Sequence, residues 1–323
     1  HVGSISLGER FALQSMELLK PGGAAVHTVE FTLSSDSDTV ERGMTALWRR
    51  QDMERMWADH RALGYGMQPP CWNAGSHLHD TKPDLPPYDL LSLGADNGTS
   101  WNLDVQKAHI KLLISGHVCT SMGWVATKNS PAPVAAVSAS AAALPLVHPP
   151  SDFAMAWKLH ASKTDILRQR RGERRQAAIA ALRQLPTILD VFKDTKGRCH
   201  GGALQPRVAT NSETTGEDAQ RIMSALLLTS VPHRKQWEFV FIVKALEALD
   251  MLRPGRRGIV FAAGDEPTIS YFASKGVEIL VAGVDPGSDD PCAGPKTVRR
   301  QLTSGGKEAL FKETLVSRSE FER

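Results

Sequence analysis

The chain has 323 residues, of which 41% are hydrophobic, enough for the packed core of one large domain or two ordinary ones. Its 38 basic and 35 acidic residues leave a net charge of only +3, so the composition indicates neither a nucleic-acid partner nor binding to an anionic membrane surface. Four widely spaced cysteines argue against a zinc knuckle, a redox dithiol or a disulfide framework, and we expect a reducing, cytoplasmic location.

Helix and strand patterns alternate in the first 70 residues. The predicted elements are helices over 7–19 and 52–63 and strands over 24–33 and 45–48. The first helix should end before Pro21, because proline cannot continue a helix, and Gly22 and Gly23 allow the turn into the strand. We expect Asp52 to cap the second helix, which buries its methionines in the core.

An irregular stretch and a hairpin follow. Residues 68–102 are rich in proline, glycine, aspartate and asparagine, which predicts a long excursion of the kind that often covers a site. Strands over 109–114 and 118–126 then form an antiparallel pair that turns at Gly116.

The centre of the chain is expected to connect two structured parts. Residues 129–157 form an Ala/Pro-rich linker, and residues 158–230 form a helical and loop connector with a loop over 195–216. The most apolar stretch, 134–147, is too short for a membrane span, which needs about 20 apolar residues.

The last part of the chain reads as helix, strand, helix, strand. Apolar residues at helical spacing from Trp237 to Leu249 predict a helix that ends before Pro254. The apolar run over 259–263 is typical of a parallel strand buried on both faces. A crossover helix over 267–275 would lead to a second strand over 277–281.

This strand, turn, helix and strand make a unit that can cradle a nucleotide at the carboxyl end of its first strand. Gly264 is the only glycine in the turn Gly264-Asp265-Glu266-Pro267, so the dinucleotide fingerprint with three glycines is not met. A nicotinamide-dependent oxidoreductase is therefore disfavoured.

Two stretches together resemble class I S-adenosylmethionine-dependent methyltransferases. They are Leu19–Phe31, with the sequence LKPGGAAVHTVEF, and Trp237–Pro267. More narrowly, they look like a bacterial group that often occurs beside or fused to glycan-assembly enzymes. In that group the Trp-Glu helix and the Gly-Glu-Pro turn open the domain. The Lys-Pro-Gly-Gly turn, the His-Thr-x-Glu-Phe strand and a Thr-Ser-x-Gly strand, here Thr120–Gly123, close it.

The resemblance covers about two thirds of the chain, in inverted order. It implies an α/β fold with a Rossmann-like class I methyltransferase sheet, incomplete or split, and a helical linker region. Residues 1–128 correspond to the C-terminal half of such a domain and residues 231–323 to the N-terminal half, while the family's third and fourth strands are missing.

Two explanations compete for this order: parts of two tandem copies, or one permuted domain whose halves meet. We expect the tandem fragment, because a permuted sheet without its middle strand would leave unpaired backbone groups on two strands.

The resemblance implies S-adenosylmethionine as cofactor. The cofactor-binding positions carried over are Ala262, Gly264, Glu266 and Pro267 in the first turn and Asp285 near the end of the second strand. Gly283 stands where the family has its usual acid, so Asp285 is the nearest carboxylate for the ribose.

His27 and Glu30 are the candidate catalytic residues, with His109 and Tyr88 as companions. A histidine can act as general base toward a hydroxyl, and a His/Glu/His set can hold a divalent metal, although we expect no resident metal. The alternative is that His27 and Glu30 only fix the strand by hydrogen bonds, since three-residue spacing places them on opposite faces.

The implied activity is methyl transfer to a hydroxyl of a sugar or glycolipid. Whether this fragment is active by itself is left open. The alternative is a non-catalytic interaction module with a methyltransferase fold in a glycan-assembly system. We expect a small-molecule or glycan substrate, a tandem domain or glycosyltransferase as partner, no nucleic acid and no membrane span.

Overall fold

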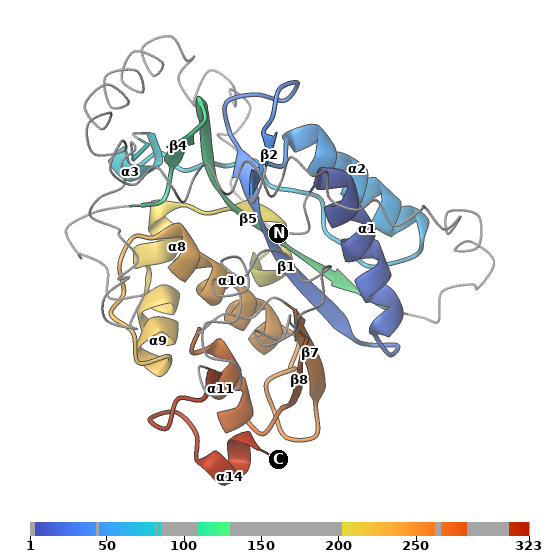
Figure 1. The fold of residues 1–323 in the computed structure, drawn as a ribbon, viewed down its shortest axis with the longest axis vertical. Helices are drawn as coiled ribbons and strands as arrows, with labels where there is room; N and C mark the ends of the chain where they lie inside the picture. The colour runs from blue at the N-terminus through green and yellow to red at the C-terminus, as the bar shows by residue number, and fades with distance from the viewer. Residues whose placement is uncertain are drawn as a thin grey trace, which may run out of the picture.

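The computed structural model describes residues 4–42, 45–81, 83–84, 109–129, 202–261, 266–282 and 310–322 (Figure 1). The expected linker over 129–157 beyond its first residue, the expected connector over 158–230 up to residue 201, and Tyr88 lie outside these residues. Three cofactor positions, Ala262, Gly264 and Asp285, also lie outside them.

A four-stranded antiparallel sheet forms the centre of the molecule (Figure 1). Its middle strand is β5 (His117–Thr127), which pairs along one edge with all of β1 (Ala24–Thr32). The other edge of β5 pairs with β4 (Leu112–Ile114) and β6 (Arg207–Val208). The predicted hairpin is therefore confirmed, and its turn contains Ser115 and Gly116, both with positive φ as a two-residue hairpin turn requires.

Two helices cover one face of this sheet and one covers the other. On the first face, α1 (Ile5–Ser15) and α2 (Arg50–Ala62) share a core with Phe31, Met122 and Trp124. On the second face, α10 (Arg234–Ala248) packs Trp237 and Phe241 against Val125. Alternate residues of β1 and β5 thus face opposite cores, as the pleat of a strand dictates.

The helices predicted for the first 70 residues are present. Ser4 caps the start of α1 by accepting the N–H of Leu7 at 3.2 Å. A 3-10 turn, η1 (Met16–Leu18), follows the end of α1. Asp52 is not the N-cap of α2, because Arg49 holds that position. Asp52 lies in the first turn, where its carboxylate accepts the backbone N–H of Arg49 at 2.9 Å.

Residues 202–230 contain more regular structure than the expected connector and loop. They form η4 (Gly202–Leu204), β6, α8 (Asn211–Thr215) and α9 (Glu217–Ala225). The loop expected over 195–216 is therefore wrong from residue 202 onward. The short strand exists because it pairs with β5, a tertiary partner that local sequence patterns do not reveal.

The second sheet is a parallel pair, β7 (Arg257–Phe261) and β8 (Glu278–Ala282), joined through α11 (Thr268–Ser274). The parallel pairing was predicted, but burial on both faces is wrong. No residue of β7 is buried, and Leu280 of β8 is 65% exposed, because among the described residues β7 and β8 pair only with each other. The described architecture is mixed α/β with a partly antiparallel sheet, and it does not include a continuous Rossmann-like sheet.

Smaller elements complete the described residues. They are β2 (Glu41–Arg42), β3 (Thr45–Ala46), α3 (Leu78–Thr81) and α14 (Arg318–Phe321). Cys71 is disulfide-bonded and Cys119 is a buried free thiol, so the argument from cysteine spacing was wrong for Cys71. Within the described parts, no helix is both long and apolar enough to cross a membrane.

Phe241 of α10 packs directly on Gly123 of β5. A Cβ built at this position would lie 2.5 Å from Cε1 of Phe241, whose ring is fully packed. We predict that Gly123→Ala lowers the free energy of unfolding by about 1–3 kcal/mol, as overpacking does, measured by urea denaturation. Gly258→Ala is the matched control, because a Cβ at this strand position meets nothing within 4 Å. Equal stability of the two variants would contradict the close packing.

Candidate functional site

A buried cluster of charged and polar side chains lies between the sheet and the first turns of α10. It joins Thr28 and Glu30 of β1, Ser121 of β5, and Arg234, Lys235 and Glu238 of α10. Thr28 and Glu30 alternate along β1 with the residues that face α1 and α2, so they point toward α10.

Arg234 is the centre of the cluster. Its Nη2 lies 2.8 Å from Oε1 of Glu30, and its Nη1 lies 3.4 Å from Oγ of Ser121 and 3.8 Å from Oε1 of Glu238. Burial would lower the pKa of Arg234, but Glu30 and Glu238 raise it above its ordinary value, so the guanidinium stays charged.

Glu238 receives the remaining donors. The Ser121 hydroxyl donates to Oε1, the Thr28 hydroxyl donates to Oε2 at 3.4 Å, and Lys235 Nζ lies 3.0 Å from Oε1. Two carboxylates and two cations therefore balance each other. This balance is what allows four charged groups to lie at the interface of a helix with a sheet.

Two stacked histidines lie at the N-terminus of α10. The rings of His109 and His233 are 4.8 Å apart between centroids and 16° from parallel, and backbone hydrogen bonds fix both residues. Nδ1 of His109 lies 2.8 Å from Oδ2 of Asp84, whose side chain is 34% exposed. The carboxylate accepts the Nδ1 proton, which leaves the lone pair of the neutral ring on Nε2.

Both histidines are neutral near pH 7. Burial lowers the pKa of His109 and outweighs the opposing effect of Asp84, and Arg234 lowers it further. Burial holds the pKa of His233 well below its ordinary value, and protonation of His233 beside a protonated His109, or beside Arg234 and Lys235, would be unfavourable as well. A neutral histidine oriented by a carboxylate is the arrangement that a general base requires.

His27 lies on the opposite face of β1 from Glu30, as the spacing predicted. Its ring stacks on Trp124 at 5.1 Å and meets the edge of Phe11 at 6.1 Å. Ser15 donates its hydroxyl proton to the carbonyl of Ala12, so its oxygen accepts from Nε2 of His27 at 3.1 Å. The structure therefore brings Glu30 together with His109 through Arg234, but it separates both from His27.

The turn of the proposed nucleotide unit is described only at its end. Pro267 is buried and is the N-cap of α11, and its carbonyl accepts the N–H of Tyr271 at 3.0 Å. Glu266, which is half-buried, comes directly before it. Where the chain is described, no three His, Cys, Asp or Glu side chains are arranged to hold a metal ion.

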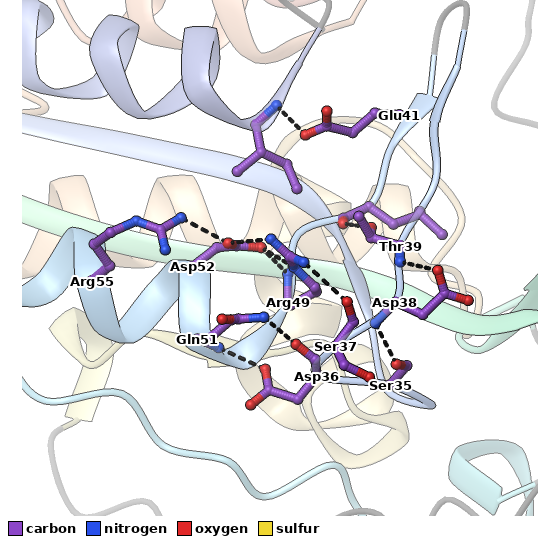
Figure 2. Close-up of polar contacts among 12 residues, drawn as sticks. Ser35, Asp36, Ser37, Asp38, Thr39, Glu41, Arg49, Gln51, Asp52 and Arg55 are labelled. Atoms are coloured by element: carbon purple, nitrogen blue, oxygen red, sulfur yellow. Dashed lines mark hydrogen bonds and ion pairs between the residues drawn. The ribbon is translucent and has the colours of Figure 1, made fainter.

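A second polar network fixes the loop that follows β1 (Figure 2). The carboxylate of Asp52 is fully buried and accepts from Nε of Arg49 at 2.8 Å and from Nη2 of Arg55 at 2.8 Å. Arg49 also donates to the carbonyl of Ser37 at 3.2 Å, and the N–H of Gln51 donates to Asp36 at 2.8 Å. Because the loop is tied to the start of α2, the carboxyl end of β1 has a fixed position.

Sequence reasoning named Glu30 and His109 but missed several partners. The missed residues are Asp84, His233, Arg234, Lys235 and Glu238. The role of Ser121 as a hydrogen-bond donor to Glu238 was also missed. The signal for His233, Arg234 and Lys235 was that they form a charged run directly before an apolar helical pattern, which also fits a solvated helix start.

The burial of His27 predicts acid sensitivity. Burial, with a smaller effect of His60, lowers its pKa from the ordinary value of 6.5 to about 4. The unfolded chain therefore binds this proton at higher pH than the folded chain, so the contribution to stability is complete above pH 6.5 and is lost as pH falls toward 4. This single group accounts for a loss of at most about 3 kcal/mol.

Urea denaturation at intervals across that pH range measures the effect. We expect His27→Gln to have a flatter dependence of unfolding free energy on pH, but not a flat one, because His60, His109 and His233 shift in the same direction. His77→Gln, at an exposed position, is the control. An unchanged slope in His27→Gln would contradict the neutral, packed histidine.

Comparisons with known proteins assign no family to the chain. No family model matches it, and neither does any curated protein or solved structure.

Proposed function

We propose that the chain carries the elements of a class I S-adenosylmethionine-dependent methyltransferase and acts on a hydroxyl of a sugar or glycolipid. The observation that carries this proposal is the parallel pair β7 and β8 with α11 in the crossover. The crossover begins at the carboxyl end of β7, the position at which open α/β sheets bind nucleotides. In the sequence, Ala262, Gly264, Glu266 and Pro267 lie between the end of β7 and the start of α11.

A second observation supports the resemblance. Three motif segments that lie far apart in the sequence meet in the buried cluster: Glu30 from His-Thr-x-Glu-Phe, Ser121 from Thr-Ser-x-Gly, and Glu238 from the Trp-Glu helix. Residues quoted for the resemblance therefore contact each other or the shared partner Arg234. Such convergence is expected if the segments belong to one kind of domain.

S-adenosylmethionine, when bound, supplies a methyl group that its sulfonium already activates, so the protein must position the acceptor and remove its proton. A residue of the chain would take the hydroxyl proton of the acceptor as the methyl group is transferred. We assign this role to Nε2 of His109, with Asp84 as the positioning residue. Glu30 is a weaker candidate for the base because Arg234 neutralises it at 2.8 Å.

One observation favours the alternative of a non-catalytic interaction module. Both residues first named as catalytic make packing or ion-pair contacts that a purely structural role explains, His27 with Ser15 and Trp124, and Glu30 with Arg234. The module would bind the cofactor without transferring its methyl group. The two experiments below separate this outcome from the enzyme.

The first experiment measures cofactor binding. We expect saturable binding of S-adenosylmethionine by isothermal titration calorimetry and at least about tenfold weaker binding in Gly264→Val, because a side chain in the turn occupies the space of the ligand. Gly258→Ala on β7 is the control, since its Cβ meets nothing. A flat titration with protein that is folded by circular dichroism would contradict both forms of the proposal.

The second experiment measures methyl transfer to a panel of sugar and glycolipid hydroxyl acceptors by mass spectrometry. We expect His109→Gln to lower the rate by about 10²–10⁴, the usual contribution of a general base, with cofactor binding unchanged. His77→Gln is the control, because His77 is exposed. Cofactor binding without transfer to any acceptor in the wild type would favour the interaction module instead.

A further inference from the structure

We propose that the contact between α10 and the sheet is strong enough to hold residues 4–129 and residues 202–282 together without a covalent link between them. In this proposal, residues 4–129 and residues 202–282 remain associated after the polypeptide is cut between them. We call this contact the seam: it comprises the faces of β1 and β5 that α10 covers, together with β6. The proposal does not depend on methyl transfer.

Aromatic anchors form the apolar centre of the seam. Trp237 and Phe241 of α10 are each 1% exposed and stack at 5.0 Å between ring centroids. Phe241 lies over Gly123, where any side chain on β5 would overlap its ring. Buried aromatic side chains seated at a small residue are the feature that dominates binding energy in protein interfaces.

Charge complementarity lies beside this apolar centre. Residues 4–129 contribute the carboxylate of Glu30, and residues 202–282 contribute the guanidinium of Arg234. Glu238 crosses the seam in the same way, since it accepts from Ser121 and Thr28. If the parts separated, each would present a charge or a polar group that is matched only by the other.

Backbone pairing continues across the seam. β6 adds to the edge of β5, and the N–H of Ala209 donates to the carbonyl of Ser121 at 2.8 Å. The N–H of His109 donates to the carbonyl of Pro232 at 2.8 Å, and Arg234 returns a bond to the carbonyl of His109 at 3.0 Å. Strand addition supplies affinity through main-chain hydrogen bonds, and the side chains supply specificity.

Two deeply buried charged side chains of residues 4–129 also contact the backbone of residues 202–282, next to β6. Lys111 is 1% exposed and donates to the carbonyl of Ala209, and Asp80, also 1% exposed, accepts the N–H of Asn211 at 2.8 Å. Apolar, charged and backbone contacts thus all cross between the same two parts. The halves whose order is inverted in the sequence are therefore inferred to be partners of each other, as in a permuted domain.

The test uses the full chain with a specific protease site inserted between residues 130 and 201. The folded protein is cleaved and kept under reducing conditions, so that the disulfide of Cys71 cannot hold the pieces together. We expect one species containing both pieces by size-exclusion chromatography with light scattering at about 1 µM, a concentration at which only specific complexes persist. Two separate species would overturn the proposal.

A charge reversal then tests whether the seam is the contact that holds the pieces. Arg234→Glu places a third carboxylate beside Glu30 and Glu238, and we expect association of the cleaved pieces to weaken at least about a hundredfold. Arg253→Glu is the control, since Arg253 is 54% exposed and lies outside the seam. If Arg234→Glu does not fold before cleavage, Phe241→Leu replaces it, with the same expected direction. Association unchanged in the seam variant would also overturn the proposal.

Discussion

The ion pair between Arg234 and Glu30 is the constraint on which the position of α10 depends. Both side chains are nearly buried, 11% and 12% exposed, so each would be costly without the other. A buried ion pair is weak evidence of net stability, because desolvation offsets much of its attraction. Its effect is on geometry: Arg234 reaches both Glu30 of β1 and Ser121 of β5 only when α10 lies at one position along the two strands.

The period of two along β1 decides which residues share a site. His27 and Phe31 face α1 and α2, whereas Thr28 and Glu30 face α10. The same alternation along β5 places Trp124 beside His27 and Ser121 beside Glu238. One face of the two strands is therefore apolar with a neutral histidine, and the other carries carboxylates that are balanced by cations. A register shift of one residue would exchange the two faces.

Long periodic elements could be predicted from the sequence, whereas contacts between distant segments could not. The strands over 24–33 and 118–126 and the helix beginning near Trp237 carry enough apolar repeats to define their type. β6 has two residues and exists only through β5, and the disulfide of Cys71 depends on distance in space rather than on spacing in sequence. Local patterns contain neither kind of information.

The candidate site follows the same division. Glu30 and His109 stood out as chemically capable residues on predicted strands, but a charged residue such as Arg234 at the start of a helix has the pattern of a solvated face. Its burial becomes evident only when the sheet that covers it is known. The parallel strand predicted from residue 259 was right in direction and wrong in burial, because a continuous apolar run does not say whether both neighbouring strands are present.

The helix α10 connects the two sheets through opposite faces. One face of α10 packs toward β5 through Trp237, Phe241 and Ala245. Another face packs with α9, α11 and the start of β8 through Phe239, Val240 and Val243 (Figure 1). Because α10 packs against both groups of elements, it cannot shift relative to one of them without disturbing its contacts with the other. The Asp84–His109 pair lies at the start of α10, and α11, which follows β7 in the chain, packs on the same helix. If the cofactor binds at the carboxyl end of β7 and the acceptor binds beside His109, the packing of α10 sets the distance between them.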